Sequence, residues 1–209
     1  MNLELINRIL TSLILLPVLI YSLYYAGLYL IIFLILVYCL SFYEIIRNTK
    51  NLLFNISSNV AIIFALFSFY YLRGDTNYSL VIIYWILLST FLSDIGGYVF
   101  GKTFKGKKLT KISPNKTISG SIGSFVFSLL LIPIFYNRLI VHDLLTLIIL
   151  TITISLISQL GDLFISLLKR KAKVKNTSDI LPGHGGLLDR VDGIIFAAPL
   201  GVLLLNFLN

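Results

Sequence analysis

The sequence predicts an all-α, polytopic transmembrane protein with about seven membrane-spanning helices. Of its 209 residues, 57% are apolar and only 12% are charged, and the mean hydropathy is +0.94. A water-soluble domain of this length could not bury so much apolar surface. The membrane is therefore the expected solvent for most of the chain.

Seven apolar stretches have lengths near the ~17–25 residues that a helix needs to cross the hydrocarbon core. They cover residues 9–25, 28–43, 56–72, 78–100, 118–136, 144–168 and 194–209. The run from Ile9 to Tyr43 is too long for one crossing, so we expect a tight turn at Ala26-Gly27. Because a second apolar helix follows the first at once, we expect no cleavable signal peptide.

The basic residues predict the orientation of these helices. The net charge is +8, and fifteen of the seventeen basic residues lie on one side of a seven-helix arrangement, with only Arg73 and Arg138 opposite. The positive-inside rule then places the N-terminus and the polar loops 101–117 and 169–193 in the cytoplasm. In a membrane protein this charge indicates orientation, and we expect no nucleic acid partner.

We expect two regions along the chain. Residues 1–90 form N-terminal transmembrane helices, and residues 91–209 form a catalytic transmembrane region that contains both cytoplasmic loops. The single cysteine, Cys39, lies in a predicted helix, so neither a disulfide framework nor a cysteine metal site is available.

Small residues recur at four-residue spacing on two predicted helices. These are Ser93, Gly97 and Gly101 on one helix and Gly120, Ser124 and Ser128 on the next. Small side chains allow membrane helices to approach closely. We expect helix packing there, and such faces permit a homodimer without requiring one.

Two acids, Asp94 and Asp162, interrupt otherwise apolar helices. A carboxylate at the membrane centre costs about 2.5–3.5 kcal/mol on insertion scales, so such a residue usually faces a cavity or a partner. Asp94 begins a glycine-rich turn and could be a ligand, a base or a structural cap. Asp162 belongs to a set spaced by three or four residues, which one helix face presents to the bundle interior. The set is Ser155, Ser158, Asp162, Ser166 and Lys169.

The first polar loop ends in Lys111-Ile-Ser-Pro-Asn-Lys-Thr117. Ser113, Lys116 and Thr117, together with free N–H groups at a helix N-terminus, could hold an anion such as phosphate. The alternative is that the lysines of this loop only anchor the helices and attract anionic lipid.

The second polar loop carries five cations between Lys169 and Lys175, followed by Leu181-Pro-Gly-His-Gly-Gly-Leu-Leu-Asp-Arg-Val-Asp192. Three glycines around His184 allow close backbone approach to a ligand. His184 could be a general base, a phosphate donor or a turn residue, and we favour a positioning role. Asp189 and Asp192 share one face if this stretch is helical.

Carboxylates beside basic residues suit a nucleotide phosphate with a divalent cation, because hard cations prefer oxygen ligands and basic groups neutralise the remaining charge. Asp162 and Asp189 are the first choice as magnesium ligands. No CxxC or HExxH pattern is present, which argues against zinc.

The two loops and the Asp94 segment resemble, in order, the signature of the phosphatidate cytidylyltransferase family, also called CDP-diacylglycerol synthases. The matching strings are Ser93-Asp-Ile-Gly-Gly-Tyr98, Ser113-Pro-Asn-Lys-Thr117, and Ser166-Leu-Leu-Lys-Arg170 through Lys175 to the Pro182–Asp192 segment. The resemblance covers roughly residues 90–200. One departure is Asn176, where the family has an acid; Asp179 could substitute in part.

The resemblance implies a nucleotidyltransferase of phospholipid biosynthesis. It would transfer a cytidylyl group from CTP to phosphatidate, giving CDP-diacylglycerol and pyrophosphate, at the cytoplasmic face of a bacterial inner (plasma) membrane. It implies Mg²⁺ at Asp162 and Asp189 with Asp192 in support, and a monovalent cation such as K⁺ beside it. The other implied site residues are Lys169, Arg170, Lys175 and Arg190 for phosphate charge, Gly183, His184, Gly185 and Gly186 for the nucleotide, and Asp94, Ser113, Lys116 and Thr117 for completing the substrate site.

Two alternatives stay open at this point. A related CTP-dependent lipid-alcohol kinase would use the same layout and release CDP in place of pyrophosphate. An ion-coupled transporter would use Asp94 and Asp162 as intramembrane ion sites. It would also predict inverted repeats, whereas the two polar loops differ in length and motif.

Overall fold

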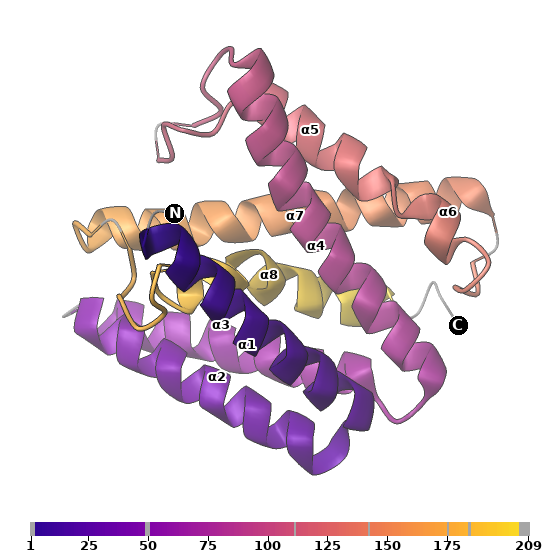
Figure 1. Ribbon diagram of the computed structural model, residues 1–209, viewed down its shortest axis with the longest axis horizontal. Coiled ribbons are helices and arrows are strands. Elements are labelled where there is room, and N and C mark those ends of the chain that lie inside the picture. Colours follow the sequence, from indigo (N-terminus) through magenta and orange to yellow (C-terminus); the bar gives the residue numbers. More distant parts are fainter. Residues whose placement is uncertain are drawn as a thin grey trace.

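A computed structural model describes residues 3–48, 51–110, 112–141, 143–174, 176–183 and 185–204. Within these ranges the regular structure is helical (Figure 1), which confirms the predicted fold class. The helices are α1 (Leu3–Tyr25), α2 (Gly27–Asn48), α3 (Leu52–Arg73), α4 (Asn77–Phe104), α5 (Ile118–Leu129), α6 (Ile132–Phe135), α7 (Leu144–Lys171) and α8 (Leu188–Leu204).

Five helical segments are long and apolar enough to cross a membrane, namely α2, α3, α4, the α5–α6 segment and α7. The Ile9–Tyr25 part of α1 is a shorter apolar helix, and α8 has 17 residues. Large apolar side chains such as Leu13 and Leu53 are exposed on the outer helices, as a lipid-facing surface requires. The chain is therefore an integral membrane protein, while seven crossings and the orientation stay predictions.

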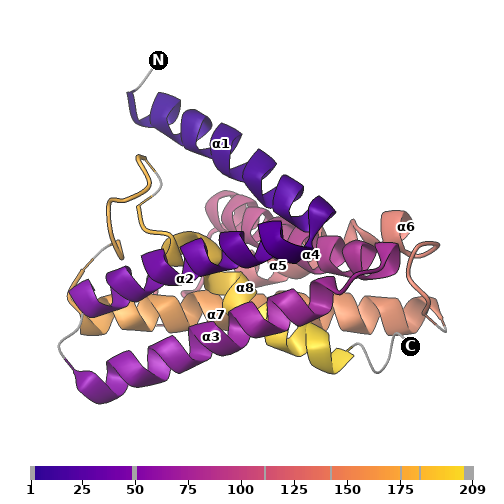
Figure 2. The ribbon, with the colours of Figure 1, turned by 90° about the horizontal axis from the view of Figure 1, so that it is seen from below.

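Helix α8 lies at the centre of the bundle, where it packs against α3, α4 and α7. Helix α5 packs along α4 and α7, and α1 packs against α2. Figure 2 shows that the N-terminal part of α1 diverges from the other helices. The α4–α5 and α7–α8 loops lie at the same end of the bundle as the C-terminus of α2, on the left in Figure 1.

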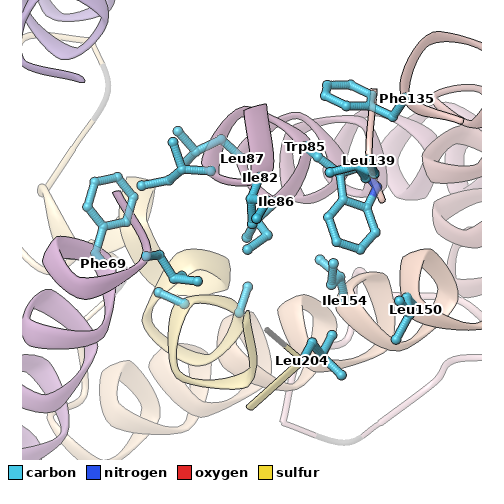
Figure 3. Close-up of a cluster of buried hydrophobic side chains, with 14 of the residues drawn as sticks. Phe69, Ile82, Trp85, Ile86, Leu87, Phe135, Leu139, Leu150, Ile154 and Leu204 are labelled. Carbon is cyan, nitrogen blue, oxygen red and sulfur yellow. The ribbon is translucent and has the colours of Figure 1, made fainter. Parts of the chain in front are cut away.

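An apolar core fills the half of the bundle that is distant from these two loops. Trp85 and Ile86 of α4 meet Ile154 of α7 and Leu204 of α8 there (Figure 3). Because this core fixes the N-terminal halves of α4 and α7, their C-terminal halves can carry the polar residues without losing their relative position.

The prediction of a glycine-rich turn at Asp94 is wrong, because Gly96 and Gly97 lie inside α4. These glycines instead allow α4 to touch α5: a Cβ atom on Gly96 would lie 2.3 Å from the carbonyl oxygen of Gly123, and one on Gly97 would lie 2.8 Å from Ser124 Oγ. The predicted close packing of small residues between these helices is confirmed.

The expected continuous helix over 118–136 is also wrong in one detail, because α5 ends at Leu129 and α6 starts at Ile132. Pro133 lacks an N–H group and cannot continue the helical hydrogen bonds. The amides of Leu130 and Leu131 bond to carbonyls three residues earlier, which tightens the chain at this point.

The tight turn at Ala26-Gly27 is confirmed, with φ values of 51° and 47°. Arg73, buried at the end of α3, stabilises this turn. Its guanidinium donates hydrogen bonds to the carbonyls of Leu23 and Tyr24, which have no partner within α1 at its C-terminus.

Candidate active site

The polar face of α7 points into the bundle as predicted. Ser155 and Ser158 are fully buried, and Ser155 Oγ lies 2.8 Å from Ser93 Oγ of α4. At the loop end of the same face, Ser166 Oγ donates to Asp162 Oδ1 over 3.4 Å. The two buried serines act in packing, and the charged chemistry is confined to the loop end of the helix.

Three carboxylates from three helices lie close together at this end. Asp94 of α4, Asp162 of α7 and Asp192 of α8 are near enough for mutual electrostatic repulsion. The α7–α8 approach is set by Gly161, where a Cβ atom would lie 2.3 Å from the carbonyl oxygen of Asp192. A nearby cation would reduce the repulsion among these carboxylates, and the first loop supplies one.

That cation is Lys116, whose Nζ lies 2.5 Å from Asp162 Oδ2. The loop is held in a hairpin-like turn, with Leu109 N donating to the Lys116 carbonyl over 2.8 Å. A second link joins the two loops, because Arg170 Nε donates to the Ile112 carbonyl over 3.2 Å. The two polar loops thus form one site.

Thr117 and Ser113 take local roles in this loop. Thr117 Oγ1 accepts from Gly120 N at 3.0 Å and so caps α5, while the carbonyl of Ser113 accepts from Lys116 N at 3.0 Å. Their predicted contact with substrate stays a prediction.

Asp189, in the first turn of α8, is held by contacts to both of its oxygens. Lys169 Nζ lies 2.7 Å from Oδ1. Oδ2 accepts hydrogen bonds from Thr177 N, Thr177 Oγ1 and Gly186 N at 3.0, 3.1 and 3.1 Å. This carboxylate therefore joins the end of α7, the loop and the start of α8.

The same contacts change the acidity of Asp189, which precedes the apolar part of α8. Burial alone would raise the pKa of its carboxyl. The hydrogen bonds from Lys169 and from the Thr177 and Gly186 amides favour the ionised form and outweigh burial, so the pKa lies below its ordinary value of 3.8.

The glycine loop is a tight turn closed by a pair of backbone hydrogen bonds between Leu181 and Gly185. Gly183 and Gly185 have φ values of 76° and 83°, which suit glycine. At Gly186 a Cβ atom would lie 1.8 Å from Thr177 Oγ1. This glycine is required by contacts within the protein itself, a role that the sequence alone did not indicate.

Two predicted site residues, Lys175 and His184, lie outside the described residues. Arg170 and Arg190 are exposed, and Arg190 interacts electrostatically with Asp94. The structure thus brings most of the predicted cations to the same end of the bundle as the three carboxylates.

Glu44 near the end of α2 is the main site residue that the sequence analysis missed. It is fully buried, and its carboxylate bonds to the loop between α7 and α8. A signal was present, because Glu44 is the only acid between Glu4 and Asp75 and adjoins the apolar stretch 28–43. The insertion-cost argument used for Asp94 and Asp162 applies to it equally.

The donor set fits magnesium, which usually takes one or two protein carboxylates and leaves other positions to phosphate and water. Within the described part of the chain, no three His, Cys, Asp or Glu side chains form a ready metal cluster. Among the described residues, Asp162 is contacted by Lys116 and Ser166 only, so it keeps more acceptor capacity than Asp189. The assignment of magnesium to Asp162 and Asp189 stays a prediction.

Comparisons with known proteins find one matching family and several relatives. The model of a family described as the cytidylyltransferase family matches residues 48–208. Curated relatives named phosphatidate cytidylyltransferase include one from Bacillus subtilis, 39% identical over 132 residues, which are 61% of this chain and 48% of the relative. One from Staphylococcus saprophyticus is 43% identical over 141 residues, which are 66% of this chain and 54% of the relative. One from Helicobacter pylori is 37% identical over 146 residues, which are 70% of this chain and 53% of the relative. The chain spans about half the length of the curated relatives it matches.

Proposed function

We propose that this chain, which belongs to the cytidylyltransferase family, transfers a cytidylyl group from CTP to phosphatidate and releases pyrophosphate. The observation that carries the proposal is the ion pair between Lys116 and Asp162, which joins the first polar loop to α7 at one end of an apolar bundle. A site for a soluble nucleotide and a membrane lipid needs cations and carboxylates at such a place.

The reaction needs positioning and charge neutralisation more than acid–base catalysis. A phosphate oxygen of phosphatidate, already anionic, attacks the α-phosphorus of CTP. A new phosphorus–oxygen bond forms, and the bond from the α-phosphorus to the bridging oxygen of pyrophosphate breaks. No proton has to be removed from the nucleophile, so the absence of an assigned general base is consistent with the proposal.

The basic side chains at the loop end of the bundle would neutralise the phosphate groups of CTP and phosphatidate. Lys116 is paired with Asp162 of the carboxylate cluster, Lys169 lies at the end of α7, and Arg170 and Arg190 are exposed. Basic groups held in a fixed position stabilise charge that develops on the leaving pyrophosphate. Lys175 would add to this set.

Asp162 would hold Mg²⁺, with Asp189 as the predicted second ligand and Asp94 or Asp192 as further oxygen donors. When bound, the ion would neutralise phosphate oxygens and orient the triphosphate. K⁺ as a companion cation is an expectation from the family resemblance only.

A cytoplasmic site in a bacterial inner membrane is part of the proposal. It is supported by the fifteen basic residues that fall on one side of the seven-helix arrangement. CTP would reach the two loops from the cytosol, while phosphatidate would reach them from the adjoining leaflet.

The test is the product analysis of purified protein in detergent micelles given CTP labelled at the α-phosphorus, phosphatidate and Mg²⁺. We expect labelled CDP-diacylglycerol and free pyrophosphate. Asp162→Asn should abolish the product, whereas the matched control Asp75→Asn, exposed on the α3–α4 connection, should not. In a parallel reaction with a lipid alcohol in place of phosphatidate, release of CDP with a phosphorylated lipid alcohol would instead indicate the related kinase. The absence of CDP-diacylglycerol from folded protein given phosphatidate would refute the proposal.

A further inference from the structure

Glu44 binds the α7–α8 loop from α2, of which only Asn48 belongs to the segment matched by the family model, residues 48–208. Its side chain has no exposed surface. Each carboxylate oxygen accepts two hydrogen bonds. Oε1 accepts from Ser178 Oγ and Leu187 N, both at 2.7 Å. Oε2 accepts from Thr177 Oγ1 at 2.8 Å and from Leu188 N at 3.0 Å.

These four donors belong to the two ends of one loop. Thr177 and Ser178 follow α7, whereas Leu187 and Leu188 supply amide groups at the N-terminus of α8, where no partner exists within the helix. One carboxylate therefore closes the loop of residues 176–188 on itself and attaches it to α2. Asn48 of α2 adds a hydrogen bond from Nδ2 to the Thr177 carbonyl.

The attachment extends to the catalytic end of α7 through one hydroxyl. Thr177 Oγ1 lies 2.8 Å from Glu44 Oε2 and 3.1 Å from Asp189 Oδ2, and Asp189 is in turn paired with Lys169. A hydroxyl has one proton, so Thr177 donates to one carboxylate at a time while its amide keeps its bond to Asp189. A displacement of Glu44 would therefore move Thr177 and disturb the Asp189–Lys169 pair.

Burying the carboxylate of Glu44 costs free energy unless hydrogen bonds compensate for the lost water. The neighbouring Ile45 belongs to an apolar cluster that also contains Ile165, Leu168 and Leu188. An ionisable group beside such a cluster is stable only when its hydrogen bonds are satisfied, and those of Glu44 are satisfied entirely by the loop.

We infer that Glu44 is a positioning residue, which holds the loop of residues 176–188 and, through Thr177, the Asp189–Lys169 pair in the arrangement needed for nucleotidyl transfer. This inference rests on the proposed function. It assigns to the N-terminal helices a direct part in ordering the site.

The test compares Glu44→Gln and the double variant Thr177→Val/Ser178→Ala with wild type. The double variant keeps the carboxylate and removes two donors, so the inference stays testable if Glu44→Gln does not fold. Ser41→Ala is the matched control, since Ser41 is equally buried one turn earlier on α2 and its hydroxyl has no hydrogen-bond partner among the described residues.

Two readouts are needed. Trypsin cleavage after the exposed Lys171 and Lys173, followed by mass spectrometry, reports loop attachment independently of activity. Steady-state kinetics separates KM for CTP from kcat. We expect faster cleavage in both test variants, with KM for CTP raised and kcat/KM lowered by about 10- to 100-fold, because small displacements of a positioned group have effects of that size. Ser41→Ala should match wild type.

The outcomes separate the two proposals. Unchanged cleavage and kinetics in both variants would overturn the inference, and so would faster cleavage with an unchanged KM and only a lower apparent kcat, which indicates loss of folded protein. If wild type makes no CDP-diacylglycerol but trypsin still cleaves Glu44→Gln faster than wild type, the proposed reaction is refuted and the attachment of the loop by Glu44 is supported.

Discussion

Lys116 Nζ lies 2.5 Å from Asp162 Oδ2, and the two side chains are 24% and 29% exposed. A partly exposed ion pair contributes only about 0–1 kcal/mol to stability. The pair therefore matters less for holding the fold than for placing a cation beside three carboxylates. It also places Lys116 where a phosphate group bound near Asp162 would meet it.

Lys116→Met should leave the thermal stability of the detergent-solubilised protein nearly unchanged and lower kcat/KM by about 100- to 1,000-fold, the usual effect of losing one preorganised charge-stabilising group. The measurement is CDP-diacylglycerol formation under initial-rate conditions. Lys107→Met, an exposed lysine of the same loop, is the control and should stay within about twofold of wild type. Equal losses in both variants would indicate a general effect of loop charge.

Asp189→Asn should abolish turnover without preventing membrane insertion. Asparagine can still accept from Thr177 and Gly186, but its amide group would face Lys169 Nζ and leave that cation without a partner. We expect destabilisation of about 1–3 kcal/mol, measured by thermal unfolding. If Asp189 acts mainly by positioning, added Mg²⁺ should not restore activity. Recovery at high Mg²⁺ would instead support the direct metal assignment.

Asp189 also predicts how stability responds to acid. Its folded pKa lies below the ordinary value of 3.8, so the unfolded chain binds the proton more readily. The stabilisation is then fully present well above pH 3.8 and is lost as the pH falls through the folded pKa. Thermal unfolding of wild type and Asp189→Asn, followed from neutral pH down to this range, should show a difference that shrinks in acid. A difference independent of pH would show that the charge of Asp189 is not the source of the stabilisation.

The α4–α5 contact predicts unequal effects for adjacent glycines. Gly96→Ala would place a methyl group 2.3 Å from a backbone oxygen, whereas Gly97→Ala would meet the hydroxyl of Ser124 at 2.8 Å, which can rotate away. Overpacking typically costs about 1–3 kcal/mol, and we expect Gly96→Ala at or above the top of that range and Gly97→Ala near the bottom. Thermal unfolding measures both, and the reverse order would show that the helices separate easily.

The sequence predicted those features of the site that depend on one helix at a time. The spacing from Ser155 to Lys169 identifies a polar face, and the apolar pattern places both loops at one end of the bundle. Contacts between distant segments could not be predicted in this way. Glu44 and Leu187 are 143 positions apart, and no periodicity links them. The prediction of a turn at Gly96 is wrong for the same reason, because its partner Gly123 lies on another helix.

Asn176, where the resemblance described above predicts an acid, flanks the glycine turn. A Cβ atom on Gly185 would lie 3.4 Å from Asn176 Cγ and 3.2 Å from Asp189 Oδ2, so both side chains border the same glycine. Asn176→Asp would bring a second carboxylate near Asp189. The repulsion should lower stability in the absence of a divalent cation.

With Mg²⁺ present, Asn176→Asp should raise kcat/KM several-fold if an acid at this position contributes to the site, because the added charge then has a cation to offset it. Asp179→Asn tests whether Asp179 substitutes for the missing acid. It should lower the activity of the wild-type chain but have little effect once Asn176→Asp is present, and this non-additivity is the measurement that identifies the substitution. Equal losses in the two backgrounds would mean that Asp179 acts independently of position 176.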